Sequence, residues 1–232
     1  MQLISEKDKF FSIIAHDLRS PLTTFLGFTQ LLEAELDTMT LKEIQLIAKS
    51  MRSSATNLFN LLGNLLEWSR MKRGVTPFFP DTLFLLDTIS GGLQTIADSA
   101  LQKTIAVQYD IPGDLQVFAD QFMLTSTVRN LVSNAVKFTK PGGTISISAN
   151  SSTANWVTMF IKDTGIGMDQ ETLSKLFQLD GQINRIGTEG ELSTGLGLLL
   201  CKEFVEKHGG SLWAESEEEI GSTFCFTLPF KS

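Results

Sequence analysis

The sequence predicts an α+β protein in which an N-terminal antiparallel helical hairpin precedes a two-layer α/β sandwich. Apolar residues recur with helical spacing over most of residues 5–74, in two long stretches separated by a short connection. From about residue 75 onward, helix patterns occur in mixed order with short strand candidates, which is typical of a two-layer sandwich. We therefore expect two domains, over residues 1–74 and 75–232.

The hairpin is predicted from residues that start and end helices, as well as from the helical periodicity. The first helix is expected to end near residues 36–38, and Thr40 and Glu43 then form a capping-box pattern that starts the second. Gly74 is expected to end the second helix, with Pro77 just beyond it. One hairpin cannot bury both of its apolar stripes, so we infer a homodimer in which two copies form a four-helix bundle.

The elements of the second domain follow from the same periodicities. Helices are expected over residues 83–102, 121–138, 170–177 and 196–208. Strands are expected over residues 105–109, 115–118, 144–149, 156–162, 212–215 and 223–228. Residues 77–80 are predicted to form a linker or short strand, and residues 178–194, which lack a clear period, a mobile loop.

Composition argues against several classes of protein. The formal net charge of -7 argues against nucleic acid as the main partner, because phosphate binding needs clustered Lys and Arg. No apolar run approaches the ~20 residues of a membrane span, and no signal peptide is visible. The two cysteines, Cys201 and Cys225, have no metal-ligand spacing and are interpreted as buried, reduced thiols of a cytoplasmic protein.

His16 is a candidate base or nucleophile, because it falls on the polar side of the first helix, where a histidine has little packing role. Asp17 can orient the imidazole and accept a proton from it. Ser20, four residues after His16, lies on the same helical face. Pro21 removes the helical partner of the Asp17 carbonyl and predicts a kink beside His16. The alternative is a solvated surface histidine beside an ordinary helix kink.

Three motifs of the second domain each suit a different part of Mg-ATP. Asn130, Asn134 and Lys137 recur on one helical face, where amide oxygens suit Mg²⁺ and the lysine suits phosphate. Asp163 ends a strand and precedes two glycines, so its carboxylate can accept a hydrogen bond from an exocyclic amine such as that of adenine. The third motif, residues 194–198, opens a helix whose backbone N–H groups favour phosphate. Each motif alone also fits an ordinary polar face, turn or helix start.

With these motifs in place, the sequence resembles the catalytic core of a bacterial sensor histidine kinase of a two-component system, over essentially the whole chain. The matching segments are His16–Pro21 (H box), Asn130–Phe138 (N box), Asp163–Gly167 (G1 box), Leu176–Phe177 (F box) and Gly195–Gly197 (G2 box). The resemblance implies a dimerisation and histidine phosphotransfer domain followed by an ATP-binding domain of the GHKL, or Bergerat, type.

The resemblance also implies roles. His16 would accept phosphate from Mg-ATP with Asp17 as general base, and the phosphoryl group would pass to an aspartate of a response-regulator receiver domain. Asn134 would bind Mg²⁺, with Asn130 and Lys137 near the phosphates. The remaining residues implied in ATP binding are Phe138 and Asp163 at the adenine, Gly165, Gly167, Arg185 at the γ-phosphate, Gly195, Leu196, Gly197 and Thr223. Residues 178–194 would be the ATP lid.

Some residues depart from the common family pattern. Ser20 stands where Thr or Asn is usual, at a position tied to removal of phosphate from the partner. Glu189 and Glu191 in the lid would oppose phosphate unless they point outward. One alternative is an ATP-driven clamp of the gyrase or mismatch-repair type, which lacks an H-box hairpin. Another is a phosphatase-dominant protein or a non-catalytic dimeric signalling scaffold. His208, before two glycines at a helix end, is interpreted as a structural cation.

Overall fold

The computed structural model describes residues 2–74, 76–153, 155–178, 185–189, 191 and 196–230. Within these ranges, the side chains of residues 2–14, 16, 17, 95, 152 and 153 are not described. The chain divides into two compact units, Met1–Lys72 and Arg73–Ser232, and each is described by itself. None of the helices in the described ranges is long and apolar enough to cross a membrane.

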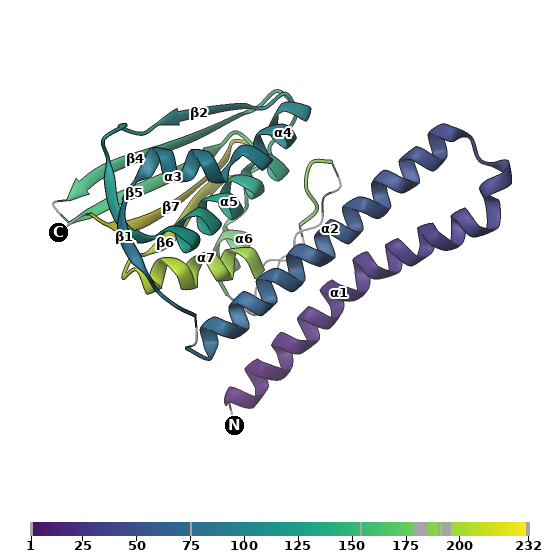
Figure 1. Ribbon diagram of the computed structural model, residues 1–232, viewed down its shortest axis with the longest axis horizontal. Helices are drawn as coiled ribbons and strands as arrows, with labels where there is room; N and C mark the ends of the chain where they lie inside the picture. Colours follow the sequence, from purple (N-terminus) through teal and green to yellow (C-terminus); the bar gives the residue numbers. More distant parts are fainter. Residues whose placement is uncertain are drawn as a thin grey trace. The chain divides into compact units, whose positions relative to one another are not determined.

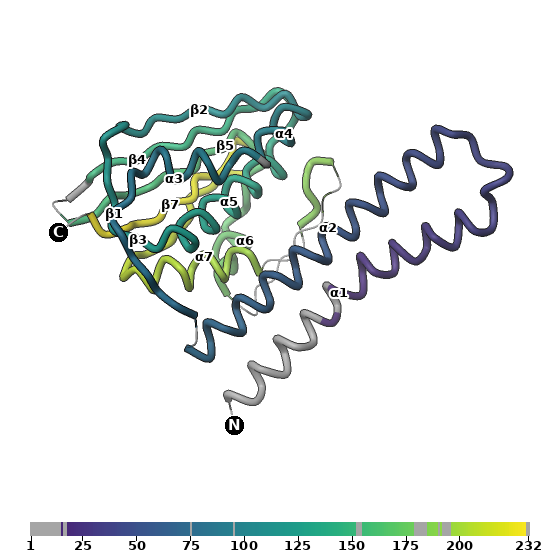
Figure 2. The backbone as a smooth tube through the Cα atoms, viewed as in Figure 1, coloured from purple at the N-terminus to yellow at the C-terminus, as the bar shows by residue number. Residues whose placement is uncertain are grey.

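The first unit is the expected helical hairpin, made of α1 (Gln2–Glu35), the short 3₁₀ helix η1 (Leu36–Thr38) and α2 (Leu41–Lys72) (Figures 1 and 2). The capping box is confirmed, because the Thr40 backbone N–H donates to Glu43 Oε2 at 2.8 Å and the Glu43 N–H donates to Thr40 Oγ1 at 3.3 Å. Pro21 lies inside α1, and the helix continues beyond it.

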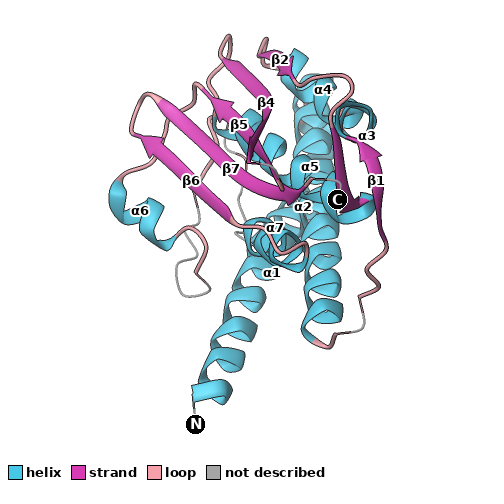
Figure 3. Cartoon of the chain, turned by 90° about the vertical axis from the view of Figure 1, so that its left-hand side faces the viewer, coloured by secondary structure: helices cyan, strands magenta, loops and turns pink. Residues whose placement is uncertain are grey.

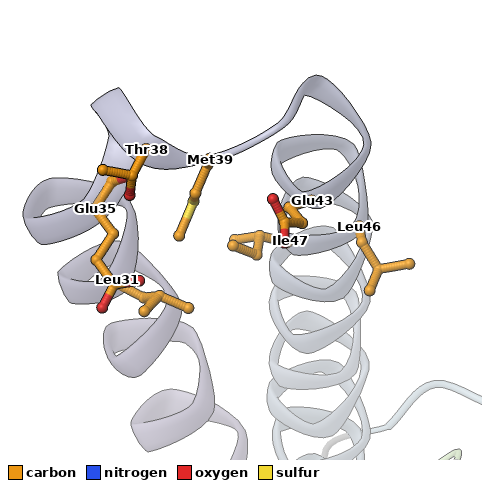
Figure 4. Close-up of a pocket in the computed structure, with 7 residues that line it drawn as sticks. All are labelled: Leu31, Glu35, Thr38, Met39, Glu43, Leu46 and Ile47. Atoms are coloured by element: carbon orange, nitrogen blue, oxygen red, sulfur yellow. The ribbon is translucent and has the colours of Figure 1, made fainter.

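The hairpin leaves much of its apolar surface open. Phe59 is 77% exposed, although it lies in the middle of α2. The other large exposed apolar side chains of the unit are Leu22, Leu26, Leu31, Leu36, Leu41, Leu46, Leu62 and Leu66. A cavity of about 280 Å³ lies at the connecting end, where Met39 and Ile47 point into the space between the two helices (Figure 4). A single hairpin therefore does not fill its own interior.

The second unit is built on a five-stranded mixed sheet in the order β2-β4-β5-β7-β6 (Figure 3). Its strands are β2 (Ala106–Asp110), β4 (Thr144–Thr153), β5 (Trp156–Asp163), β6 (Leu212–Glu217) and β7 (Gly221–Pro229). The β2–β4 pair is parallel and the other pairs are antiparallel. A separate two-stranded sheet joins β1 (Pro80–Phe84) to β3 (Gln116–Asp120).

Helices cover one face of the large sheet, which makes the expected two-layer α/β sandwich (Figures 1 and 3). They are α3 (Leu85–Gly92), α4 (Gln94–Gln102), α5 (Gln121–Phe138) and α7 (Leu196–Lys207), with the short α6 (Gln170–Lys175) near β6. The single helix expected over residues 83–102 is instead the end of β1 (Leu83 and Phe84) followed by two helices. A Cβ on Gly92 would lie 2.3 Å from Thr125 Cγ2, so the glycine at the end of α3 lets the chain lie close against α5.

The segment after Gly74 is docked on the second unit. Lys207 Nζ donates to the Thr76 carbonyl at 2.7 Å, and the Phe79 N–H donates to Asp120 Oδ2 at 2.9 Å. The Phe78 ring meets the His208 ring edge-on, with 5.0 Å between the ring centroids. These contacts hold residues 76–79 against the second unit.

His208 has the structural role expected of it, but it is not a cation. Its Nδ1 lies 2.7 Å from the Phe204 carbonyl, and its Nε2 accepts the Asp120 N–H at 2.9 Å. An acceptor Nε2 carries no proton, so the imidazole is neutral. Burial lowers the pKa of His208 further below its usual value.

Candidate functional site

Helix α5 presents the first group of candidate residues. The Asp120 carboxylate caps its start by accepting the Met123 N–H at 3.1 Å. One side of α5 is buried in the core, whereas Asn130, Asn134 and Lys137 are half-buried along a neighbouring face, as their spacing predicts. The Nδ2 of Asn130 is buried and has no hydrogen-bond partner among the described residues. A buried amide N–H without an oxygen acceptor is able to donate to a ligand at this face.

Asp163 is the buried carboxylate of the site and lies at the end of β5. Its side chain is buried, with the residue only 3% exposed. Oδ1 accepts the Gly165 N–H at 2.8 Å and the Ser222 N–H at 3.3 Å. Burial raises the pKa of Asp163 to about 6, against the opposing effect of the two N–H donors. Both of these bonds use Oδ1, so Oδ2 is the atom left for a ligand that donates a hydrogen bond.

The loop after Asp163 is clamped between α5 and the turn that joins β6 to β7. The Ile166 N–H donates to the Phe138 carbonyl at 3.1 Å, and the Glu219 N–H donates to the Ile166 carbonyl at 2.9 Å. A Cβ on Gly165 would lie 2.5 Å from the Phe138 carbonyl oxygen. Glycine at this position therefore lets the loop touch the end of α5, which brings Asp163 close to Phe138.

Gly167 cannot be replaced without strain, because both its backbone conformation and the space around it favour glycine. Its φ is +60°, and a Cβ there would lie 1.9 Å from the Glu217 carbonyl oxygen. We expect Gly167→Ala to lower the free energy of unfolding by about 2 kcal/mol or more, because backbone atoms must move to admit the methyl group. Thermal denaturation measures this. Gly113→Ala is the matched control, since nothing lies within 4 Å of its added Cβ; equal stability of the two variants would contradict the clamp.

The strand register corrects the position expected at β7. Thr223 pairs with the exposed Lys162, whereas Ser222 pairs with Asp163. Directly paired residues of antiparallel strands point to the same face. Thr223 therefore lies on the face opposite Asp163, and Ser222 is the β7 residue beside it. The buried residues Phe224, Phe226 and Leu228 share the parity of Ser222, so the alternation of the strand carried a signal that could have identified it.

Two basic residues approach the Phe138 ring. Lys137 Nζ lies 5.4 Å from the ring centroid, and Arg185 Cζ lies 5.5 Å from it. Burial lowers the pKa of Lys137 to about 8; the negative charge of Glu191 opposes this shift, and Lys103 adds to it. The Glu191 carboxylate is paired with a cation, because its Oε1 forms an ion pair with Lys103 Nζ at 2.6 Å. Sequence reasoning gave no signal for Lys103.

Several candidate residues lie at the edge of what the structure describes. Leu196 has its side chain in the core, so at the start of α7 it offers a ligand only its backbone N–H. Gly197 is half-buried, whereas Gly195 and most of the expected lid lie outside the described residues. His16 and Asp17 lie on α1, but their side chains also lie outside the description, and Ser20 is exposed.

The site residues therefore fall into two sets. The structure brings together Lys137, Phe138, Gly165 and Arg185 where the end of α5 meets the loop after β5 and the segment that contains Arg185. Asn130 and Asn134 lie on the preceding turns of α5, and Asp163 and Gly167 flank Gly165 in the sequence. His16, Asp17 and Ser20 belong to the separate hairpin.

Comparison with known proteins matches both units to protein families. Residues 6–74 match the family model described as the His Kinase A (phospho-acceptor) domain. Residues 119–232 match the model described as histidine kinase-, DNA gyrase B- and HSP90-like ATPase.

Curated relatives carry the name adaptive-response sensory kinase SasA. The relative from Synechococcus elongatus is 32% identical over 237 residues, which cover 97% of this chain and 61% of the relative. The relative from Gloeothece citriformis is 31% identical over 231 residues, covering 97% of this chain and 58% of the relative. The chain thus spans about three fifths of the length of the curated relatives it matches.

Solved structures show the same fold. The Acinetobacter baumannii histidine kinase AdeS matches with a TM-score of 0.72 and 18% identity, over 94% of this chain and 98% of that chain. Histidine kinase ThkA, solved in complex with the response regulator protein TrrA, matches with a TM-score of 0.74 and 22% identity, over 99% of this chain and 64% of that chain. The solved structures show the fold, whereas the two family models and the named kinases establish that the chain belongs to the sensor histidine kinases and comprises their catalytic core.

Proposed function

We propose that this chain autophosphorylates His16 from Mg-ATP and passes the phosphoryl group to an aspartate of a response-regulator receiver domain. The observation that carries the proposal is the recessed carboxylate of Asp163, which is held through one oxygen by two backbone N–H donors beside the polar face of α5. Such a carboxylate suits the exocyclic amine of adenine. The family match of the hairpin supports the assignment of the acceptor.

The residues around Asp163 fit the other parts of the nucleotide. Phe138 offers its ring to the adenine, while Lys137 and Arg185 offer positive charge to the phosphates. The unpartnered buried Nδ2 of Asn130 fits a phosphate acceptor, and the half-buried Asn134 supplies the amide oxygen that suits Mg²⁺. When bound, Mg²⁺ neutralises phosphate charge and favours transfer.

The proposed chemistry exchanges one phosphorus bond for another. An imidazole nitrogen of His16 bonds to the γ-phosphorus as the bond from that phosphorus to the β,γ-bridging oxygen breaks, and ADP leaves. The attacking nitrogen supplies its lone pair, and Asp17 accepts the proton from the other ring nitrogen. His16 and His208 are the two histidines of the chain. Both ring nitrogens of His208 are engaged with backbone groups, which supports the proposal that His16 is the acceptor.

In the second transfer a receiver carboxylate oxygen bonds to the phosphorus as the bond from phosphorus to the His16 nitrogen breaks. The released imidazole takes back the proton held by Asp17 and is neutral again. The solved complex of ThkA with the response regulator protein TrrA supports this class of partner. The exposed Ser20 lies one helical turn after His16, where its hydroxyl can position water for the reverse, phosphatase reaction. We place these reactions in the cytoplasm, where ATP is available and the free thiols of Cys201 and Cys225 stay reduced.

We further propose that the acting unit is a homodimer joined through the hairpins. Leu62, which is 48% exposed in the single chain, then lies in the bundle interior. Leu62→Asp is expected to convert the dimer to monomers, because a buried unpaired carboxylate costs several kcal/mol. Sedimentation gives the particle mass. Asn60→Asp adds the same charge at an exposed polar position of α2 and should stay dimeric; monomeric wild type would contradict the proposal.

Labelling with γ-³²P-ATP and Mg²⁺ tests the kinase proposal. A phosphohistidine is expected, so the label on the protein should be lost in acid and retained in alkali. A label that survives acid would contradict histidine phosphorylation. Nucleotide binding without any label would contradict autokinase activity and favour the phosphatase or scaffold alternative.

A further inference from the structure

We propose that Lys103 is a positioning residue that fastens the segment 185–191 to the C-terminal end of α5 and thereby holds Arg185 over Phe138. We define Lys103, Thr188 and Glu191 as the lid latch. The inference rests on the proposed function, because it assigns the latch a role in ATP binding. It concerns a lysine that precedes β2, far in sequence from both the lid and α5.

The Lys103 ammonium group is surrounded by acceptors. Its side chain is only 6% exposed. Nζ donates to the carbonyls of Val136 at 3.1 Å and Lys137 at 3.3 Å, and to Thr188 Oγ1 at 2.9 Å. It also forms the 2.6 Å ion pair with Glu191. One cation therefore joins the last turn of α5 to two residues of the lid segment.

The chemistry of a helix end explains why a buried cation fits there. The last carbonyls of α5 have no partners within the helix and carry the negative end of its dipole. A buried ammonium group is tolerated only when it is paired and hydrogen-bonded. The carbonyls and the Glu191 carboxylate meet both needs, so the lid segment completes the environment that Lys103 requires.

The lid segment is also held by bonds that place it against α5. The Thr188 N–H donates to the Lys137 carbonyl at 3.0 Å, and Thr188 Oγ1 donates to the Thr139 carbonyl at 3.0 Å. The Gly187 N–H donates to the Glu191 carbonyl at 2.8 Å, which closes the segment on itself. A Cβ on Gly187 would lie 2.6 Å from Lys137 Cγ, so the segment rests directly on that side chain.

This arrangement connects the latch to the proposed phosphate site. Arg185 lies two residues before Gly187, so releasing the segment releases Arg185 from Phe138. Without Lys103, the Glu191 carboxylate would also lose its ion-pair partner while it remains beside Lys137, whose positive charge already interacts with it. Glu191 would then compete with phosphate for Lys137. Loss of Lys103 should therefore weaken binding of ATP more than binding of ADP, which lacks the γ-phosphate.

The test measures the dissociation constants of Mg-ATP and Mg-ADP for the full chain by calorimetry. Lys103→Met is expected to weaken ATP binding about tenfold and ADP binding about threefold or less. Adding Glu191→Gln removes the competing carboxylate, so the double variant should bind ATP better than Lys103→Met alone. Lys140→Met is the matched control, because it removes the exposed 2.7 Å ion pair with Glu219 and should change neither constant.

Hydrogen exchange of the nucleotide-free protein separates failure of the latch from failure of the proposed function. The Thr188 amide should exchange faster in Lys103→Met than in wild type or Lys140→Met, whether or not the chain binds ATP. Unchanged exchange at Thr188 would overturn the latch. Equal losses of ATP and ADP binding, without rescue by Glu191→Gln, would overturn its positioning role. Absence of nucleotide binding in wild type, with exchange as expected, would overturn the proposed function and the role of the latch in ATP binding, but not the latch itself.

Discussion

Replacing His16 by glutamine is expected to abolish phosphorylation while leaving the binding of Mg-ATP unchanged. Glutamine has no imidazole nitrogen to attack phosphorus, so the proposed acceptor is lost. The residues proposed to bind ATP belong to the other compact unit, so the affinity of the protein for Mg-ATP should not depend on the His16 side chain. Labelling with γ-³²P-ATP and calorimetry with Mg-ATP measure the two properties on the same preparation.

His208→Gln is the matched control for the loss of a histidine. It removes the acceptor of the Asp120 N–H and the contact with the Phe204 carbonyl, so it should lower thermal stability. At a temperature where this variant stays folded, it should still accept phosphate. A label that persists in His16→Gln, or that disappears only in His208→Gln, would contradict the assignment of the acceptor.

Asp163→Asn is expected to impair ATP binding and to stabilise the nucleotide-free protein at neutral pH. Asparagine can keep its oxygen toward the N–H groups of Gly165 and Ser222, which then turns its amide donor toward the adenine amine. Two facing donors should weaken ATP binding about 10- to 100-fold. Calorimetry with Mg-ATP measures this loss.

The stability gain should depend on pH, because the pKa of Asp163 rises from 3.8 to about 6 on folding. Stability from a raised carboxyl pKa is fully present below about pH 4 and is lost as the pH passes through about 6. The loss amounts to at most about 3 kcal/mol, and the neutral asparagine side chain would not incur it. The melting temperature of Asp163→Asn should therefore exceed that of wild type at about pH 7 and approach it at about pH 4.

Asp169→Asn is the matched control for this experiment. Asp169 is exposed and caps α6, and hydrogen bonds from Thr172 lower its pKa. The change should raise neither the melting temperature at neutral pH nor the dissociation constant of ATP. A neutral-pH gain confined to Asp169→Asn, or unaltered ATP affinity in Asp163→Asn, would contradict the role given to the buried carboxylate.

The sequence predicted correctly those secondary-structure elements that are determined by residues close together in the chain. The capping box at Thr40 and Glu43 forms as expected, and α5 has the predicted bounds of residues 121–138 because Asp120 caps its start. The break at Leu93 was missed, because it accompanies the close approach of Gly92 to Thr125 on another helix. Periodicity within 83–102 carries no information about that contact.

The same distinction holds for the site. The spacing of Asn130, Asn134 and Lys137 placed them on one face of α5, and Asp163 was expected at a strand end. Lys103 could not be identified, because its partners on α5 and in the lid are brought to it by the tertiary fold. Glu191 was expected to oppose phosphate unless it points outward, but nothing in the sequence indicated that its carboxylate pairs with Lys103.

The most direct test of the proposed kinase reaction is to locate the phosphoryl group after incubation with Mg-ATP. The protein is digested under alkaline conditions and its peptides are sequenced by tandem mass spectrometry with electron-transfer fragmentation, which preserves labile phosphate. We predict a phosphoramidate on His16, in the peptide that contains the start of the H box. Phosphate on His208, on a hydroxyl such as Ser20, or on a carboxylate would contradict the proposed reaction.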